Sequence, residues 1–273
     1  MGAAVGAQLR AVGVRVLWCP AGRGTATRKR AADAGLEAVV DLGELVAQCS
    51  VLLSICPPAA AEDVARRVGD YGFRGIYVEG NAVTPARVRR IATALPAAQV
   101  LDGSVIGSPP RGGKRPALFL AGAAEATEQV EKLFADTDVR IRVLCDELGR
   151  ASALKLAYTS YQKASRILAA LSYAAAAEHG VEDELLEVAG GRSGSYLTET
   201  GYFAKTAARA WRWAPELEEA AQLLRDAGLP DGPVSGAAAA LERWLPLKDT
   251  EGEPDDVLAL LHGEPEGPPS AQG

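Results

Sequence analysis

The sequence predicts an α/β domain with a doubly wound sheet, followed by a domain built only of helices. Two observations lead to this expectation. Up to about residue 145, short apolar runs alternate with amphipathic segments, which is typical of a parallel sheet with helices on both faces. Between Gly149 and Gly180 the chain contains no Pro or Gly, and Ala, Leu, Ser and Tyr recur there at helical spacing.

The first half alternates between the two kinds of element. Strands are predicted at 14–19, 51–56, 75–80, 99–107, 117–122 and 141–145. Helices are predicted at 3–12, 25–35, 42–48, 59–69, 85–95 and 124–135.

The second half begins with one long helix, which at ~1.5 Å per residue would be about 45 Å long. It ends at Gly180, a residue suited to the position after a helix. Further helices are predicted at about 182–190, 195–210, 215–227 and 234–244. We therefore expect a Rossmann-type domain at 1–147, a helical domain at 148–248 and a disordered tail, with one turn of helix, at 249–273.

Composition excludes several function classes. The net charge of −6 and the pI of 5.2 argue against binding of nucleic acids or anionic membranes. No apolar run reaches the ~18–20 residues that a membrane helix needs. Two histidines and four widely spaced cysteines favour buried reduced thiols over a metal site, so we expect a cytoplasmic protein without metal.

The opening MGAAVGAQL resembles the end of a phosphate-binding fingerprint. In a dinucleotide site the first strand runs into G-x-G-x-x-G, and the pyrophosphate lies at the N-terminus of the next helix. Gly2 matches the closing glycine, whereas the first strand and the first two glycines are missing. Either the true start lies about ten or more residues upstream, or the chain is impaired in folding and cofactor binding.

The loop after the second predicted strand favours NADP over NAD. NAD sites place an acid there, whereas NADP sites use Arg to bind the 2′-phosphate. The loop has no acid before Asp33, and Arg23, Thr25 and Arg28 can supply two guanidinium groups and a hydroxyl. The alternative is a solvated basic loop that opens a helix.

The ends of two predicted strands supply further candidate cofactor-binding residues. SICPP ends one strand, so the backbone at Cys56 and Pro57 can line the cofactor groove. EGNAVTP ends another, where Asn81 can bind the nicotinamide ribose or the substrate. Asn is equally typical of tight strand-to-helix turns. Thr84 and Pro85 predict a helix start.

Lys155 is the strongest candidate for proton transfer. It lies in an apolar, small-residue segment with Tyr158 and Thr159 one turn later on the same face. It is either a surface lysine or a proton donor whose pKa burial lowers.

At these residues the chain resembles the β-hydroxyacid dehydrogenase superfamily, which includes 3-hydroxyisobutyrate and 6-phosphogluconate dehydrogenases. The resemblance covers nearly all of 1–245. Met1-Gly2 matches the end of the family fingerprint G-x-G-x-M-G. GRASALK (149–155) fits the family's lysine motif G-x-G-x-x-x-K-x-x-N, with Ala151 at the second Gly position and Tyr158 at the Asn position. Segment 209–232 resembles a branch with its own C-terminal helical domain.

The resemblance implies hydride transfer between NADPH or NADP and a small hydroxyl or carbonyl substrate. It also implies Lys155 as general acid/base and a homodimer formed through the helical domain. The family's substrate loop reads D-A-P-V-S-G-G, but residues 102–108 read D-G-S-V-I-G-S. Ile106 therefore replaces the carboxylate-binding serine, beside Gly107, and Ser104 and Ser108 are shifted candidates. An imine or ketone reductase and a catalytically impaired dinucleotide-binding relic remain alternatives.

Overall fold

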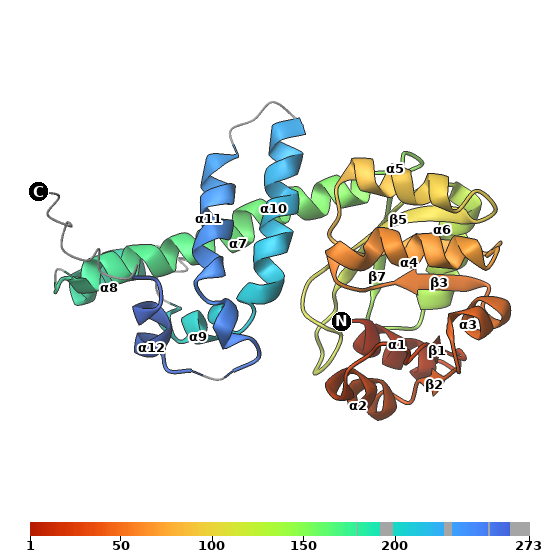
Figure 1. The fold of residues 1–273 in the computed structure, drawn as a ribbon, viewed down its shortest axis with the longest axis horizontal. Coiled ribbons are helices and arrows are strands. Elements are labelled where there is room, and N and C mark those ends of the chain that lie inside the picture. Colours follow the sequence, from red (N-terminus) through yellow and green to blue (C-terminus); the bar gives the residue numbers. More distant parts are fainter. Residues whose placement is uncertain (179, 192–198, 227–230, 251, 263–273) are drawn as a thin grey trace, which may run out of the picture. The chain divides into compact units, whose positions relative to one another are not determined.

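The computed structural model describes residues 1–178, 180–191, 199–226, 231–250 and 252–262 (Figure 1). The chain divides into two compact units, one from Met1 to Leu156 and one that begins at Ala157. The first unit is α/β and the described part of the second is helical, as the sequence predicts.

The main sheet of the first unit has five strands in the order β3-β4-β5-β6-β7. Their bounds are Val51–Ser54, Ile76–Glu79, Gln99–Ile106, Ala117–Ala121 and Arg140–Cys145. The pairs β3–β4, β4–β5 and β6–β7 are parallel, but β5 and β6 are antiparallel. This pair departs from the parallel pattern that the alternation of strands and helices predicts, and that the other three pairs follow. Only residues 107–116 join the two strands, and a parallel crossover needs a dozen or more.

A second sheet pairs β1 (Leu17–Trp18) with β2 (Glu37–Ala38) in parallel. β1 is shorter than the run predicted at 14–19. The sequence analysis missed β2, because its two residues are both exposed and carry no apolar pattern. Within the described residues, β1 and β3 lie in separate sheets.

Helices cover both faces of the main sheet (Figure 1). α1 (Gly2–Ala11) and α6 (Ala124–Phe134) pack on one face through Val5, Leu9, Val130 and Phe134. The other face is covered by α3 (Leu42–Gln48), α4 (Ala61–Asp70) and α5 (Pro85–Ala94). α2 spans Thr25–Asp33 and follows β1. The two apolar layers bury the middle of the sheet, so polar residues in the core stand out.

Local sequence signals account for several helix starts. The Asp41 carboxylate accepts the Glu44 N–H at 2.8 Å and caps α3. The Thr84 hydroxyl caps α5, and Pro85 occupies its first turn, as predicted.

The second unit begins within α7, which runs from Arg150 to Glu178. Gly180 adopts φ +63°, a left-handed conformation that favours glycine. The helices that follow are α8 (Glu182–Gly190), α9 (Phe203–Ala207), α10 (Ala210–Asp226), α11 (Gly232–Glu242) and α12 (Pro254–Ala259). The helix predicted at 195–210 begins outside the described residues. α10 starts five residues earlier than predicted and includes Pro215.

In the C-terminal segment, where we expected a disordered tail with one turn of helix from residue 249, the structure describes the short helix α12. α12 buries Val257 and Leu258, and the Trp244 indole N–H donates to the Val257 carbonyl at 2.6 Å. This apolar anchor outweighs the acidic, Pro-rich composition of the segment. Residues 263–273 lie outside the described part.

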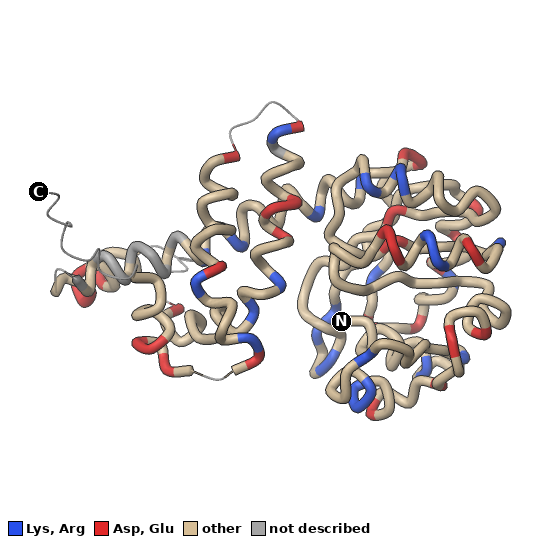
Figure 2. The backbone as a smooth tube through the Cα atoms, in the orientation of Figure 1, with Lys and Arg blue, Asp and Glu red and all other residues tan. Residues whose placement is uncertain are grey.

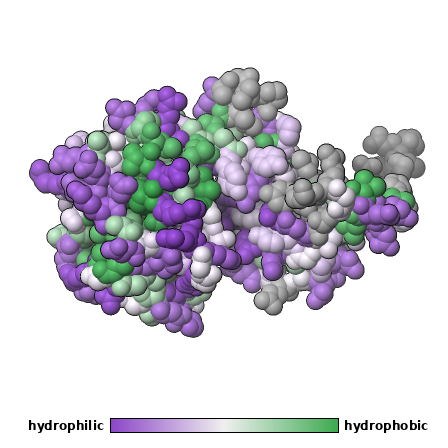
Figure 3. Space-filling model, turned by 180° about the vertical axis from the view of Figure 1, so that it is seen from behind, coloured by the Kyte–Doolittle hydropathy of each residue, from purple (hydrophilic) through white to green (hydrophobic). Residues whose placement is uncertain are grey.

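Part of the first unit's surface is apolar (Figure 3). On β7, Val143 and Leu144 are 46% and 41% exposed. A search of the described residues finds no helix that is long and apolar enough to cross a membrane.

A buried ion pair lies in the second unit, between Lys163 on α7 and Glu216 on α10. The Lys163 ammonium also lies 5.5 Å from the Trp213 ring centre, and Arg212 approaches Glu216 at 3.5 Å. Removing one partner of such a pair leaves a buried charge without its counter-charge.

We therefore expect Glu216→Leu to lower the stability of the helical unit by roughly 3–5 kcal/mol. The double variant Lys163→Met, Glu216→Leu should recover most of that loss, because no buried charge remains. Calorimetric unfolding measures both, with Glu218→Leu, an exposed position on the same helix, as the control. Equal losses in the single and double variants would contradict this account.

Candidate active site

Several predicted cofactor residues come together at the carboxyl end of β3. Gly2, the first residue of α1, lies against Ile55, since a Cβ at Gly2 would be 3.8 Å from the Ile55 Cβ. Cys56 and Pro57 follow in the turn, and the Cys56 N–H donates to the Asn81 side-chain oxygen at 2.6 Å. The structure thus brings the start of α1, the β3 turn and Asn81 to one place.

Asn81 is 4% exposed, and its side chain is engaged within the protein. Its amide nitrogen donates to the Ser54 hydroxyl at 3.1 Å and to the Glu79 carboxyl at 2.5 Å. It also approaches the Cys56 sulfur at 3.5 Å. Asn81 therefore holds the turn that follows β3 through its side-chain oxygen.

The predicted phosphate-binding residues Arg23, Thr25 and Arg28 are at or near the start of α2. Arg23 and Arg28 are exposed, and the Arg28 guanidinium donates to the Arg23 carbonyl at 3.0 Å. The N-cap of α2 is Gly24, without a side-chain cap bond, and Thr25 is the first helical residue. Three consecutive residues of this helix are basic, Arg28, Lys29 and Arg30 (Figure 2).

Arg23 also affects the pKa of Cys56, in the turn that follows β3. Burial is the main cause that raises the pKa of the Cys56 thiol, and the charge of Glu79 adds to it. The positive charge of Arg23 lowers the same pKa. The basic loop and the Cys56 turn therefore share one electrostatic environment.

Three neighbouring strands carry a row of buried polar side chains that the sequence analysis missed. Ser54, Glu79 and Asp102 are partners in register on β3, β4 and β5. Their residues are 5%, 0% and 0% exposed. We call these three residues the polar row. Each member lies in a short apolar run of the sequence. Only the alignment of these runs in the sheet shows that the three polar residues are neighbours.

Glu79 is the centre of the polar row. Its Oε1 accepts the Asn81 backbone N–H at 3.1 Å in addition to the Asn81 amide, while its Oε2 is buried without a hydrogen-bond partner. Burial raises the pKa of Glu79 to about 7, Asp102 raises it further, and Asn81 and Arg87 lower it. Glu79 is therefore protonated in a large part of the population near neutral pH.

Asp102 fastens the sheet to the start of α7. Its Oδ2 accepts the N–H groups of Gly149 and Ser152, both at 2.9 Å. Its Oδ1 accepts the Ser152 hydroxyl at 2.6 Å. These donors stabilise the charged carboxylate at a helix N-terminus, although burial raises the pKa of Asp102.

Lys155 lies on α7 one turn after this attachment. Its Nζ donates to the Val105 carbonyl at 2.9 Å, so the half-buried ammonium is held at the carboxyl end of β5. That position is next in sequence to Ile106 and Gly107, the predicted substrate loop. The hydrogen bond gives Lys155 a defined place in the first unit.

The other predicted substrate residues differ in exposure. Ser104 is buried, and its hydroxyl has no hydrogen-bond partner. Ile106 is half-buried, and Gly107 is exposed with φ +122°. Tyr158 is 43% exposed and Thr159 is 1% exposed, and both belong to the second unit.

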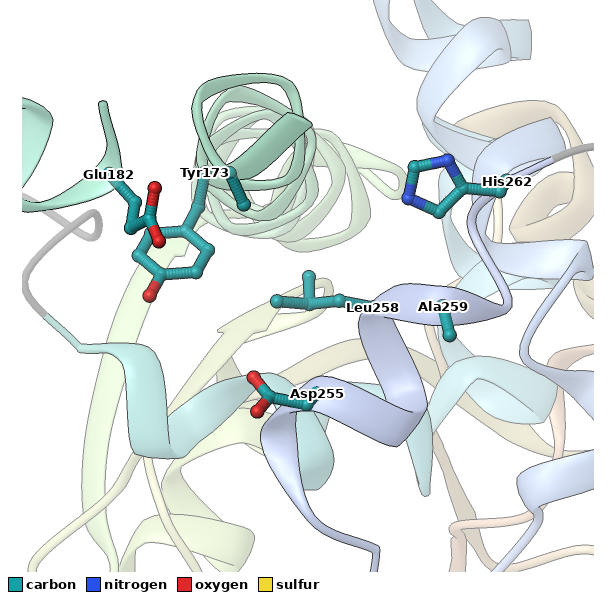
Figure 4. Close-up of a pocket in the computed structure, with 7 residues that line it drawn as sticks. Tyr173, Glu182, Asp255, Leu258, Ala259 and His262 are labelled. Carbon is teal, nitrogen blue, oxygen red and sulfur yellow. The ribbon is translucent and has the colours of Figure 1, made fainter. Parts of the chain in front are cut away.

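A cavity of about 420 Å³ opens in the helical unit (Figure 4). It is lined by Tyr173, Glu182, Asp255, His262 and three small or apolar residues of α7 and α12. None of the residues predicted from the sequence lines it. Among the residues that the structure describes, no group of three or more His, Cys, Asp or Glu side chains is placed to hold a metal ion.

Comparisons with known proteins agree with this architecture. Residues 176–244 match the model of a domain of unknown function, DUF1932. An uncharacterised 28.5 kDa protein from the 7S RNA 5′ region of Methanothermus fervidus is 30% identical over 175 residues, which are 64% of this chain and 67% of that protein.

Solved structures are similar over most of their length. The conserved protein MTH1747, of unknown function and described as similar in structure to 3-hydroxyacid dehydrogenases, is 26% identical (TM-score 0.66, 89% of this chain, 93% of that one). The 3-hydroxyisobutyrate dehydrogenase of Mycobacterium tuberculosis, with L-serine, is 16% identical (TM-score 0.72, 96% of each chain). A reductive aminase from Aspergillus terreus, in complex with NADPH, cyclohexanone and allyl amine, is 18% identical (TM-score 0.56, 96% of each chain).

Glu79 makes stability depend on pH. Since its folded pKa of about 7 exceeds its ordinary value of 4.5, the stability it contributes is present below the ordinary pKa and is lost as pH rises through about 7. The full difference amounts to roughly 3 kcal/mol. Compared with Glu79→Gln, the wild type should unfold at a similar temperature in acid and at a lower one above neutral pH. A difference in melting temperature between the two proteins that stays constant across this pH range would contradict the prediction.

Proposed function

The chain belongs to the β-hydroxyacid dehydrogenase superfamily, and from that membership we propose that it is an NADP-dependent oxidoreductase. It transfers a hydride between the nicotinamide and a small hydroxyl or carbonyl substrate. The observation that carries the proposal is the hydrogen bond from Lys155 to the Val105 carbonyl. It holds an amine at the carboxyl end of a central strand, where α/β sheets bind their ligands.

The residues at this edge fit a phosphorylated dinucleotide. The first turn of α1 consists of small residues and carries no acid, so a phosphate can approach its N–H groups. Arg23 and Arg28 supply positive charge at the loop after β1, where an acid would favour NAD. Cys56, Pro57 and Asn81 supply the turn beside Gly2 that would line the groove.

In the proposed reaction the bound cofactor supplies or accepts the hydride. Lys155 acts as the general acid/base. Its Nζ donates a proton to the substrate oxygen during reduction and accepts it during oxidation. Asp102 fixes the helix on which Lys155 lies, so the amine keeps its place relative to β5. Ser104, Ile106, Gly107, Tyr158 and Thr159 are proposed to contact the substrate.

The substrate loop favours a substrate other than a small β-hydroxyacid. Ile106 replaces the serine that would bind a carboxylate, and Tyr158 replaces the family's Asn. An imine or ketone is therefore the second candidate, supported by the reductive aminase among the similar structures. A dinucleotide-binding relic is the third, and it would bind NADPH without turnover.

We further propose a cytoplasmic homodimer that assembles through the helical unit. The helices of that unit expose large apolar side chains, among them Tyr161 at 69% and Val188 at 73%. The four cysteines have free thiols, which suits a reducing compartment.

Lys155→Met should lower turnover by about 10²–10⁴-fold, the usual contribution of a general acid/base. NADPH affinity should change by less than about twofold, because the amine touches the substrate oxygen rather than the phosphates. NADPH absorbance with hydroxyacids, ketones and ketone–amine mixtures measures turnover, and NADPH fluorescence measures affinity. Lys132→Met on α6, where the lysine side chain is 79% exposed, is the control. Wild-type activity in Lys155→Met would remove Lys155 from the mechanism.

The double variant Arg23→Ala, Arg28→Ala should weaken NADPH binding by about tenfold or more, since each charged hydrogen bond to a phosphate contributes roughly 1.5–3 kcal/mol. NADH binding should stay the same, because NADH lacks the 2′-phosphate. Arg66→Ala on α4 serves as the control for removing an exposed arginine. An equal loss for both dinucleotides would contradict the assigned specificity.

A further inference from the structure

The cavity in the helical unit has an acidic and partly aromatic lining. Its volume of about 420 Å³ lies within the range of roughly 300–1,000 Å³ that is usual for small-molecule sites. Two carboxylates line it, Glu182 of α8 and Asp255 of α12, and none of the lining residues is a lysine or an arginine. In Figure 4, Glu182 lies beside the Tyr173 ring, and His262 lies at the other end of the cavity.

The same cavity combines access from solvent with an apolar floor. Asp255, Ala259 and His262 are exposed, so a ligand can enter from their side. Leu258 is 6% exposed and lies between the polar groups (Figure 4), and Ala177 and Ala259 add further apolar surface. A short hydrocarbon chain is suited to this floor, because covering apolar surface stabilises a complex.

The electrostatic potential in the cavity is negative. Glu182 Oε2 is buried and has no hydrogen-bond partner among the described residues. Burial raises the pKa of Tyr173, and the charges of Glu182, Asp255 and Asp183 raise it further. Three carboxylates therefore act on one phenol oxygen at the cavity wall, so a positively charged ligand is favoured there.

The lining also distinguishes between kinds of ligand. Among the described residues no group of three or more His, Cys, Asp or Glu side chains is placed to hold a metal ion. Helix N-termini favour anions, but the first turns of α8 and α12 already carry acids, namely Glu182, Asp183, Glu184, Asp255 and Asp256. A further anion would be repelled. A protonated amine, by contrast, donates charged hydrogen bonds to carboxylates and is attracted to the face of an aromatic ring.

We propose that this cavity is a binding site for a small aliphatic amine in its ammonium form. The ammonium group lies at the carboxylates of Glu182 and Asp255 beside the Tyr173 ring, and the alkyl chain lies on Leu258 and Ala259. The site uses none of the residues assigned to the dinucleotide or to proton transfer, so this inference does not rest on the proposed function.

The first test is an NMR titration of the full chain with n-butylammonium. Its Kd should be about 1–10 mM, as expected for a ligand of a few heavy atoms. The amide signals that shift should belong to α8, α12 and the part of α7 around Tyr173. 1-Butanol and butyrate have the same chain length without the positive charge, so they should bind about tenfold or more weakly.

The second test repeats the titration with variants. Glu182→Gln and Asp255→Asn should each weaken butylammonium binding by about tenfold or more, because each removes a charged hydrogen bond. Glu184→Gln and Asp256→Asn remove exposed acids from the same first turns and are the matched controls. They should change the Kd by less than about twofold, since solvent and salt screen exposed charges. The spectrum of each variant without ligand shows whether it is folded.

Three results would overturn the proposal. The first is equal binding of butylammonium and butyrate, or no binding of butylammonium at concentrations well above the expected Kd. The second is an unchanged Kd in both folded lining variants, Glu182→Gln and Asp255→Asn. The third is an equal loss in the lining variants and the controls, which would mean general attraction to an acidic surface.

Discussion

The attachment of α7 to β5 is the constraint on which the rest of the site depends. Asp102 is fully buried and accepts three hydrogen bonds from Gly149 and Ser152, so a strand end and a helix start are joined by a charged group. Without these donors the carboxylate would be a buried, unpaired charge. With them, the helix that carries Lys155 has a fixed origin on the sheet, and the amine meets the Val105 carbonyl.

The polar row extends this constraint across the sheet. Ser54, Glu79 and Asp102 lie side by side on three strands, with the Cys56 turn at one end and the α7 attachment at the other. The proposed cofactor edge and the proposed proton donor are thereby linked through two neighbouring carboxyls. Inside a sheet, such a row costs free energy unless its donors and acceptors are matched. Most are matched, and Glu79 Oε2 is not.

Sequence reasoning predicted what depends on local pattern. The helices at 42–48 and 182–190 have the observed bounds, and Thr84 and Pro85 mark the start of α5 as expected. It missed β2, whose two exposed residues carry no pattern, and the packing of α12, which depends on Trp244. Asp102 and its partners are 47 to 50 residues apart in the chain, so their meeting became visible only in the folded sheet. The dinucleotide edge was predicted from the strand ends, and Lys155 from its apolar segment, with the family resemblance adding its role as general acid/base; all of these roles are proposals.

The antiparallel turn from β5 to β6 has a consequence for how this protein can diversify. Residues 107–116 form a loop with glycines at left-handed positions 107, 112 and 113, which touches a helix where the Pro110 carbonyl accepts the Gln8 amide of α1 at 3.2 Å. Loops of this kind accept insertions far more readily than packed crossovers do. The preference for the proposed substrate can therefore drift by changes in this one segment, while the proposed proton donor and the proposed dinucleotide edge are inherited intact.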